Sequence, residues 1–344
     1  MKCLDNMNKI VYFPHAPQPS GGPGTFQHHL TDELEKRGWS CRVMGTPSSD
    51  DVILVVGGTR RFWDLIVCRI RRVPVVYRLD GLRWSHKAQP TAFKIWLLFH
   101  MQNFLLFLIR KFIATSVVYQ TEFIQKWWHR EHGPSGVNEY IIWNATDLDL
   151  FFPKDRRDEA GPPRIICAEG NFPHEHDTVE LMRRISKDCI SKGLVASVDI
   201  YGGVDDKTRE ELNIINGIVA HGKCPRDEMP RNMRESDIFL SLECNPPCPN
   251  SVIEAIASGL PVVGFKTGSL VELLGPCGDY LVEHGGDPWK MDRPNHASLI
   301  DSLIRLSSEY VDAGKQARAY AEENYSRQNM TEQYIAVLTA SSKA

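Results

Sequence analysis

The sequence predicts an α/β protein made of two Rossmann-like halves that face each other across a cleft. The chain has 344 residues, whereas one domain usually holds about 100–200. Short runs of Val, Ile and Leu recur without polar alternation, which is typical of parallel strands covered on both faces. A charged, Pro- and Gly-rich segment at 153–163 separates two groups of these runs and is expected to be a linker. We expect the halves at 1–155 and 162–326.

Each half is expected to alternate strands with helices, because parallel neighbours need crossover connections. The first half should hold a helix at Thr25–Arg37 and strands at Lys9–Phe13, Ser40–Met44, Asp51–Val56 and Val73–Leu79. The second half should hold strands at Arg164–Ala168, Val195–Tyr201, Ile238–Leu242 and Pro261–Phe265.

One apolar segment of the first half, Ile95–Ile109, raises the question of a membrane. It is shorter than the ~20 apolar residues of a spanning helix. Three polar residues interrupt it: His100, Gln102 and Asn103. We expect a buried helix of the first half. The alternative is a helix at a membrane surface, flanked by the basic residues Lys94, Arg110 and Lys111.

Composition excludes some classes of protein. The formal net charge is −3 and no basic stripe is interleaved with aromatic residues, so nucleic acid is not an expected partner. The nine cysteines are scattered, and the opening residues 1–8 are polar rather than a secretory signal, so we expect reduced thiols in a cytoplasm. Cys244 and Cys248 lack a second pair at zinc spacing, and no metal is expected.

The segment 250–264 predicts an apolar helix that stops at Gly259 and leads through Pro261 into a buried strand. One carboxylate, Glu254, lies in the middle of it, and a buried charge needs a partner. Glu254 could close a capping box with Ser251, or it could bind a ligand; the spacing leaves both open. In either case Asn250 and Ser251 would start a helix whose free N–H groups can bind phosphate.

Several motifs occur in the order found in one enzyme family. They are Ser20-Gly21-Gly22-Pro23-Gly24, Val117–Phe123, Ile141–Asp147, Asp199–Gly203, Val219–Lys223, Ser236–Ser241 and Glu254-Ala-x3-Gly-x-Pro-Val-Val. Together they resemble the retaining glycosyltransferases of family four (glycosyl transferases group 1), which have the GT-B fold. The resemblance implies that a last helix, at 327–342, packs back on the first half.

The resemblance also implies which residues bind the donor. Glu254 falls on the position that holds the ribose hydroxyls, with Asn250, Ser251, Gly170 and Gly222 nearby in the donor site. The family's sugar-contacting Glu would stand at position 246, where this chain has Pro246. This departure resembles a subgroup in which the loop itself contacts the sugar.

A second departure concerns the diphosphate. The family's Arg and Lys clamp falls on Asn171 and His176, so both fixed positive charges are missing and one titratable group remains. The alternative to a role for His176 is an ordinary surface histidine. Lys223 and Lys266, each just after a strand, are alternative cations.

In the first half, Asp80 follows a predicted strand at the position where the family has a His. A carboxylate at the carboxyl edge of an open α/β sheet is well placed for a ligand, and Asp80 could act on the acceptor hydroxyl or the transferred sugar. Its alternative is a salt bridge with Arg78 or Arg83. Gly21 and Gly22 could let the backbone approach acceptor or phosphate closely.

We therefore expect a retaining, metal-independent hexosyltransferase without a cofactor. It would move a sugar from a nucleotide-diphosphate donor to a glycan or lipid-linked acceptor in polysaccharide or glycoconjugate synthesis. It would work in the cytoplasm, with peripheral membrane contact left open. Two alternatives are a non-catalytic GT-B homologue that binds nucleotide sugar or a partner subunit, and a nucleotide-sugar epimerase.

Overall fold

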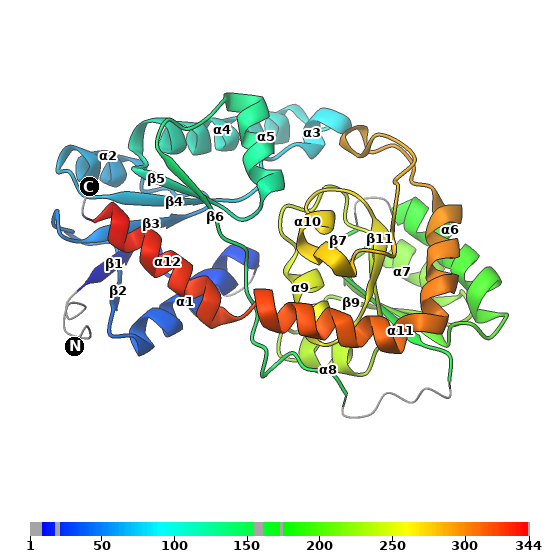
Figure 1. Cartoon of the computed structure of the whole chain (residues 1–344). Helices are drawn as coiled ribbons and strands as arrows, with labels where there is room; N and C mark the ends of the chain where they lie inside the picture. Colours follow the sequence, from blue (N-terminus) through cyan, green and yellow to red (C-terminus); the bar gives the residue numbers. More distant parts are fainter. Residues whose placement is uncertain (1–8, 18–20, 155–160, 173–174, 343–344) are drawn as a thin grey trace. The chain divides into compact units, whose positions relative to one another are not determined.

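A computed structural model describes residues 9–17, 21–154, 161–172 and 175–342. The chain forms two compact units (Figure 1). The first comprises Met1–Ala145 with Arg327–Ala344, and the second comprises Thr146–Ser326. The first unit thus ends before the predicted boundary at 155, because Thr146 pairs with Ser326 and so starts the second unit.

The first unit is built on a parallel sheet in the order β2-β1-β3-β4-β5-β6. Its strands are β1 (Ile10–Phe13), β2 (Ser40–Val43), β3 (Val52–Val56), β4 (Val75–Leu79), β5 (Ser116–Tyr119) and β6 (Asn138–Ile141). The central strands β3, β4 and β5 are buried almost throughout, as their unbroken apolar runs predict.

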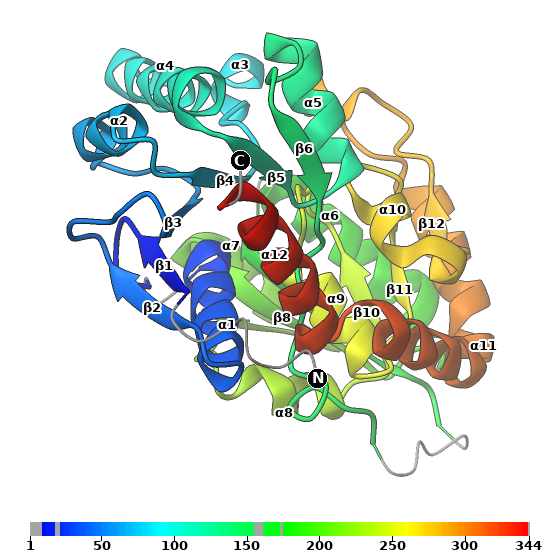
Figure 2. The ribbon, with the colours of Figure 1, turned by 60° about the vertical axis from the view of Figure 1, so that its left-hand side comes forward.

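Helices cover both faces of this sheet. Figures 1 and 2 show α1 (Gly22–Lys36) and α12 (Arg327–Ser341) on one face. The other face carries α2 (Phe62–Ile70), α4 (Phe93–Leu108) and α5 (Glu122–His132), with the short α3 (Ser85–Ala88) and the π-helical turn η1 (Ile109–Ile113). Phe26 and Leu30 of α1 pack with Tyr334 and Leu338 of α12 in one core cluster.

The second unit repeats the plan with the sheet order β12-β11-β10-β7-β8-β9, again parallel. Its strands are β7 (Arg164–Asn171), β8 (Ser197–Gly203), β9 (Ile218–Gly222), β10 (Ile238–Ser241), β11 (Val262–Phe265) and β12 (Leu281–Val282). Its helices are α6 (Glu175–Ile185), η2 (Ser186–Ile190), α7 (Asp206–Asn213), α8 (Met229–Arg234), α9 (Asn250–Ala257), α10 (Leu270–Leu274), η3 (Gly275–Cys277), η4 (Pro288–Lys290) and α11 (His296–Asn324).

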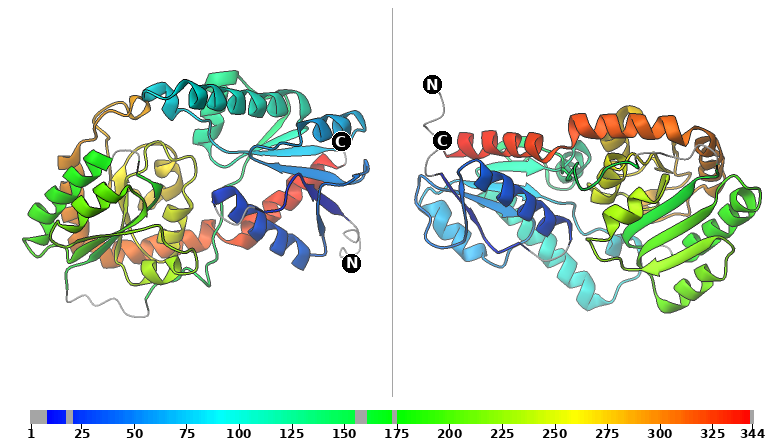
Figure 3. Two further views of the ribbon diagram at one scale, coloured as in Figure 1. Left: turned by 180° about the vertical axis from the view of Figure 1, so that it is seen from behind. Right: turned by 90° about the horizontal axis from the view of Figure 1, so that it is seen from below.

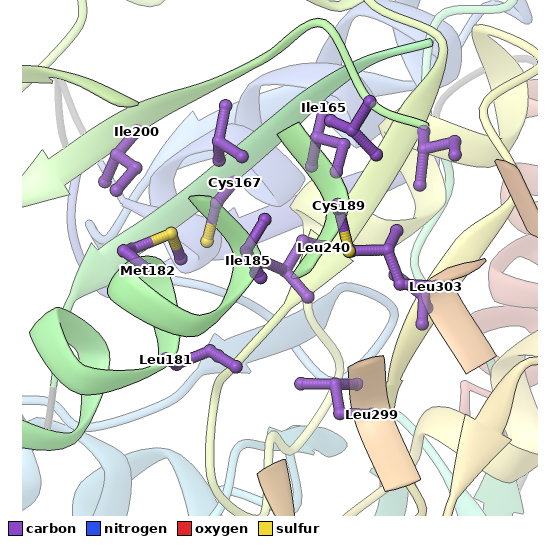
Figure 4. Close-up of a cluster of buried hydrophobic side chains, with 14 of the residues drawn as sticks. Ile165, Cys167, Leu181, Met182, Ile185, Cys189, Ile200, Leu240, Leu299 and Leu303 are labelled. Atoms are coloured by element: carbon purple, nitrogen blue, oxygen red, sulfur yellow. The ribbon is translucent and has the colours of Figure 1, made fainter. Parts of the chain in front are cut away.

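The core of the second unit lies between the sheet and the helices α6 and α11 (Figures 3 and 4). Side chains of the strands point toward those of the two helices, and all are nearly inaccessible to solvent. The residues labelled in Figure 4 are Ile165, Cys167, Leu181, Met182, Ile185, Cys189, Ile200, Leu240, Leu299 and Leu303.

The expectation that Ile95–Ile109 is a buried helix is wrong. None of the residues of α4 is buried, and Phe93, Met101 and Phe104 keep 72%, 61% and 60% of their surface exposed. The segment Phe93–Ile113 is long and apolar enough to cross a membrane by length and composition, but such a test is weak evidence for a span. Arg110, expected to flank the helix at a surface, is instead fully buried.

Candidate functional site

Candidate residues lie where parallel strands end, at the carboxyl edge of each sheet. In the first unit these edges carry Asp80 after β4, Gln120 after β5 and Asn144 after β6. Arg78, within β4, projects into the same group and is 1% exposed. The four side chains form one hydrogen-bonded ring.

The ring fixes the position of the Asp80 carboxylate. Arg78 donates to Asp80 Oδ1 at 2.9 Å and to Asn144 Oδ1 at 2.8 Å. Asn144 Nδ2 donates to Gln120 Oε1 at 3.2 Å, and Gln120 Nε2 donates to Asp80 Oδ1. The salt bridge to Arg78 that the sequence allowed is therefore present.

The salt bridge uses only one of the two carboxylate oxygens. Both donors reach Oδ1, and Oδ2 accepts no hydrogen bond from the described residues. Oδ2 faces the loop after β3, where a Cβ on Gly57 would lie 2.9 Å away. Gly57 has φ +62°, so a side chain there would be strained as well as crowded. Asp80 thus combines a fixed position with an acceptor oxygen that is open to a ligand.

Beside this edge, a pocket lies at the start of α1. It is lined by Pro14, His15, Ala16, Pro23, Gly24, Gln27, Val56, Gly58 and Thr59. His15 Nε2 lies 2.8 Å from Thr59 Oγ1, and burial, aided by Arg61 and Arg60, lowers the pKa of His15. Gly21 precedes α1 with φ +91° and Gly22 is its first residue; both are exposed. No side chain caps the start of α1, and neither Gly21 nor Gly22 is among the residues that line this pocket.

In the second unit, Glu254 lies in the middle of α9, and the capping-box interpretation is wrong. The helix starts two residues earlier than a Ser251 cap would require: Pro249 is the N-cap, and no side chain caps the helix. Asn250 and Ser251 are its first two residues. Ser251 is therefore already helical and cannot accept the bond that defines the box.

Glu254 is half-buried, and its side chain has no hydrogen bond or ion pair with any residue the structure describes. Burial raises the pKa of its carboxyl to about 7, and the positive charge of Arg226 opposes this rise. Arg226 is exposed on the loop between β9 and α8, two positions beyond Cys224 and three beyond Lys223. No sequence pattern pointed to Arg226, because only the fold brings that loop to α9.

The loop before α9, which carries Pro246, is held tightly against the start of α10. Ser269 donates to the carbonyl oxygen of Pro246 through its backbone N–H and its hydroxyl, both at 3.0 Å. A Cβ on Gly268 would lie 2.5 Å from Pro246 backbone atoms. The position where the family has a sugar-contacting Glu is thus a rigid backbone turn, with Asn245 at φ +51°.

A pair of carboxyl groups that the sequence analysis missed lies at the same edge. Glu169, in β7, is 7% exposed and accepts the backbone N–H of Leu242 at 2.9 Å. Burial, and then the charge of Glu243, raise the pKa of Glu169; burial raises the pKa of Glu243. Glu243 lines a pocket together with Asp177, Thr178, Leu181, Leu242, Cys244, Phe265, Thr267, His284, Pro294 and His296.

The remaining predicted donor residues are only partly described. Gly170 is exposed near the end of β7, and Gly222 ends β9 with φ +80°. Asn171 ends β7 and His176 lies in the first turn of α6, but both side chains are outside the described part of the structure. The structure therefore does not test the predicted role of His176.

The two alternative cations differ. Lys266 pairs with Glu283 at 3.0 Å. Lys223 is exposed and has no ion-pair partner among the described residues.

The described residues offer no metal site. In residues 9–17, 21–154, 161–172 and 175–342, no group of three or more His, Cys, Asp or Glu could hold a metal. All eight cysteines in these ranges are free thiols.

Two six-stranded parallel sheets in separate Rossmann-like units, with a final helix that returns to the first unit, constitute the GT-B fold. Solved structures agree. HepE of Anabaena, in complex with UDP and glucose, superimposes with a TM-score of 0.70 at 15% identity, over 97% of this chain and 100% of that one. Sucrose-phosphate synthase of Thermosynechococcus elongatus gives a TM-score of 0.67 at 13% identity, over 96% and 98%.

Other comparisons extend this result. A point mutant of TarM from S. aureus, solved with fondaparinux, alpha-GlcNAc-glycerol and UDP, gives a TM-score of 0.65 at 16% identity, over 90% of this chain and 58% of that one. Residues 163–308 match the family model of the glycosyl transferases group 1. The predicted resemblance to the glycosyl transferases group 1 is thereby confirmed for most of the second unit. By sequence, none of the curated proteins compared with the chain matches it.

Proposed function

We propose that this protein is a retaining, metal-independent glycosyltransferase of family four. It moves a hexosyl group from a nucleoside-diphosphate donor to a glycan or glycoconjugate acceptor in the cytoplasm. The match of residues 163–308 to the group 1 family and the UDP complexes of the neighbours HepE and TarM support this proposal.

The observation that carries the proposal is the unpartnered carboxylate of Glu254. An ionised group removed from water costs free energy unless it is paired, and Glu254 has neither a capping role nor a partner among the described residues. Two vicinal hydroxyl groups of a ribose would supply the missing donors. Ser251, in the first turn of the same helix, would then approach the donor with its backbone N–H group, and Asn250 begins that helix.

The leaving diphosphate needs positive charge. Lys223 and Arg226 offer it from one loop, and Arg226 lies close enough to affect the titration of Glu254. Peptide N–H groups at the start of α9 add a fixed partial charge. This arrangement requires no metal ion, and the rate would come from positioning and electrostatic stabilisation.

Asp80 is the candidate group on the acceptor side. Its Oδ1 is fixed by Arg78 and Gln120, so Oδ2 can accept a hydrogen bond from the acceptor or from the transferred sugar. An acceptor held on the face that the diphosphate leaves would give retention of the anomeric configuration.

The test is to incubate the protein with UDP-, GDP- and dTDP-sugars and to follow hydrolysis and sugar identity. Slow hydrolysis of one donor, lost in Glu254→Gln, is the expected result. Binding without turnover would favour the non-catalytic homologue, which the absence of Glu at position 246 also suggests. A changed sugar would favour the epimerase. Failure to bind any of these nucleotides would refute the proposal.

A further inference from the structure

The pocket at the start of α1 lies within the first unit, at the carboxyl ends of two strands. These strands, β1 and β3, are neighbours in the sheet. Part of the pocket's lining follows each of them: Pro14, His15 and Ala16 after β1, and Gly58 and Thr59 after β3. The pocket encloses about 380 Å³, including the solvent at its mouth, and small-molecule sites measure ~300–1,000 Å³. The roles proposed for Glu254 and Asp80 do not involve it.

Hydrogen bonds fix the position of His15 in this pocket. The side chain of Gln27, which is only 8% exposed, donates to the carbonyl oxygen of His15 at 2.8 Å. The ring atom Nε2 of His15 lies 2.8 Å from Thr59 Oγ1, and it accepts the backbone N–H of Arg60 at 3.4 Å. Because both the backbone and one ring nitrogen are held, the other ring nitrogen has a defined direction.

That other ring nitrogen, Nδ1, is a hydrogen-bond donor. The backbone N–H of Arg60 can only donate, so Nε2 of His15 is the acceptor of this pair. Burial, and then the charges of Arg61 and Arg60, lower the pKa of His15, so the ring is neutral at pH 7 and carries its hydrogen on Nδ1. Nδ1 has no hydrogen-bond partner among the residues that the structure describes.

Positive charge borders the pocket. Arg60 is exposed and forms no ion pair with the described residues, whereas Arg61 pairs with Asp64 at 3.5 Å. Both arginines lie close enough to His15 to lower its pKa, and no described carboxylate raises it. No Asp or Glu occurs among the described residues that line the pocket. The pocket therefore offers donors and positive charge but no carboxylate.

We propose that this pocket binds an anionic sugar, one that carries a carboxylate or a phosphate group. The anion would accept hydrogen bonds from His15 Nδ1 and from the guanidinium of Arg60, while the sugar ring would contact Pro14 and Pro23. Gly24, in the first turn of α1, adds a backbone N–H without a partner inside its helix. A neutral sugar would bind more weakly, because hydrogen bonds to a charged acceptor are about twice as strong.

The position of the pocket indicates that the anionic sugar is the acceptor rather than part of the donor. Gly58, which lines the pocket, follows Gly57, whose Cβ would lie 2.9 Å from Asp80 Oδ2. Arg78 compensates the charge of Asp80 at 2.9 Å, so a second anion nearby is not excluded. Glu254, proposed to hold the donor ribose, belongs to the second unit. The role as acceptor rests on the proposed function, whereas binding of an anionic sugar does not.

The test is a titration of the full chain, without nucleotide, with D-glucuronate, glucose 1-phosphate and D-glucose, followed by NMR. At least one of the two anions should bind on the order of 10-fold more tightly than glucose, and the tighter one tells a carboxylate from a phosphate. The preference for the anion should shrink as salt rises. Arg60→Gln and His15→Phe should each remove most of this preference, and Arg60→Lys should keep part of it.

Arg69→Gln is the matched control. It removes one exposed positive charge from the same unit, but Arg69 neither lines the pocket nor affects the titration of His15. This variant should keep the preference for the anion. His15, Arg60 and Arg69 are all exposed, so the thermal midpoints of these variants should be unchanged.

Equal affinity for the three sugars, or an unchanged preference in Arg60→Gln, would overturn the proposal. A second titration uses UDP. If Arg60→Gln weakens the binding of UDP but not that of the anionic sugars, the pocket serves the donor diphosphate and the proposal is wrong. The proposed function fails separately: a protein that hydrolyses no nucleotide sugar can still prefer the anion, and one that hydrolyses a donor without this preference refutes only the present inference.

Discussion

Replacing Glu254 with Gln should change folding stability and donor affinity in opposite directions. Burial raises the pKa of the carboxyl from 4.5 to about 7 in the folded protein. This pKa difference means that ionised Glu254 destabilises the folded state by at most roughly 3 kcal/mol. Gln keeps the shape of the side chain and removes the charge.

The pH dependence fixes the sign of the stability change. Because the pKa is raised on folding, the cost is absent below 4.5 and grows until pH passes about 7. Glu254→Gln should therefore match the natural protein in free energy of unfolding near pH 4.5. Above pH ~8 the variant should be more stable by up to roughly 3 kcal/mol.

Donor affinity should change the other way. Hydrogen bonds between an ionised carboxylate and ribose hydroxyls contribute about 1.5–3 kcal/mol, so their loss should weaken binding roughly 10- to 100-fold. Urea unfolding at several pH values measures the stability, and calorimetric titration with UDP, GDP and dTDP measures the affinity.

Glu228→Gln is the control, because Glu228 is an exposed carboxylate of the same unit. It should leave both stability and affinity unchanged. If Glu254→Gln instead loses about 1 kcal/mol of stability at every pH and keeps its nucleotide affinity, Glu254 supports the helix and binds no ligand.

Other sites lead to three more predictions. Asp80→Asn should leave nucleotide affinity intact but lower the rate of sugar transfer strongly. It should also lower folding stability, because the buried Arg78 loses its counter-charge. An unchanged turnover rate would mean that Asp80 has only a structural role. Glu169→Gln should raise the urea midpoint increasingly as pH rises above 4.5, since burial raises the pKa of Glu169; a constant difference across pH would contradict this. Gly268→Ala should lower the thermal midpoint, because its Cβ would lie 2.5 Å from the backbone of Pro246; an unchanged midpoint would mean that this turn yields easily.

The sequence predicted the strands of both sheets because each strand is marked by a short run of neighbouring apolar residues. A run such as Val75–Leu79 can be buried on both faces only in a parallel sheet, and all five of its residues are buried. The position of Asp80 could be predicted for the same reason, since the residue after such a strand lies at the carboxyl edge of the sheet. Its role toward a ligand stays a prediction.

Other features depend on contacts that no local pattern encodes. Glu169 and Glu243 are far apart in sequence and meet only because β7 and β10 are neighbours. The Ser251–Glu254 spacing suited a capping box, but Pro249 is the N-cap of the helix, so Ser251 lies inside the first turn. The apolar composition of α4 predicted burial, and this prediction was wrong because none of its residues is buried. Composition gives the hydrophobicity of a helix but does not reveal whether another element covers it.

The helix α12 has a consequence for how the protein is made. Its Tyr334 and Leu338 complete the core cluster that contains Phe26 and Leu30, yet α12 follows the whole second unit in the chain. A ribosome adds residues in order, at about 5–20 per second, so the second unit can finish folding while the first still exposes the side of α1 that α12 will cover. During synthesis that uncovered core is a target for chaperones, and a nascent chain stopped before residue 327 should be aggregation-prone even though its first sheet is fully translated.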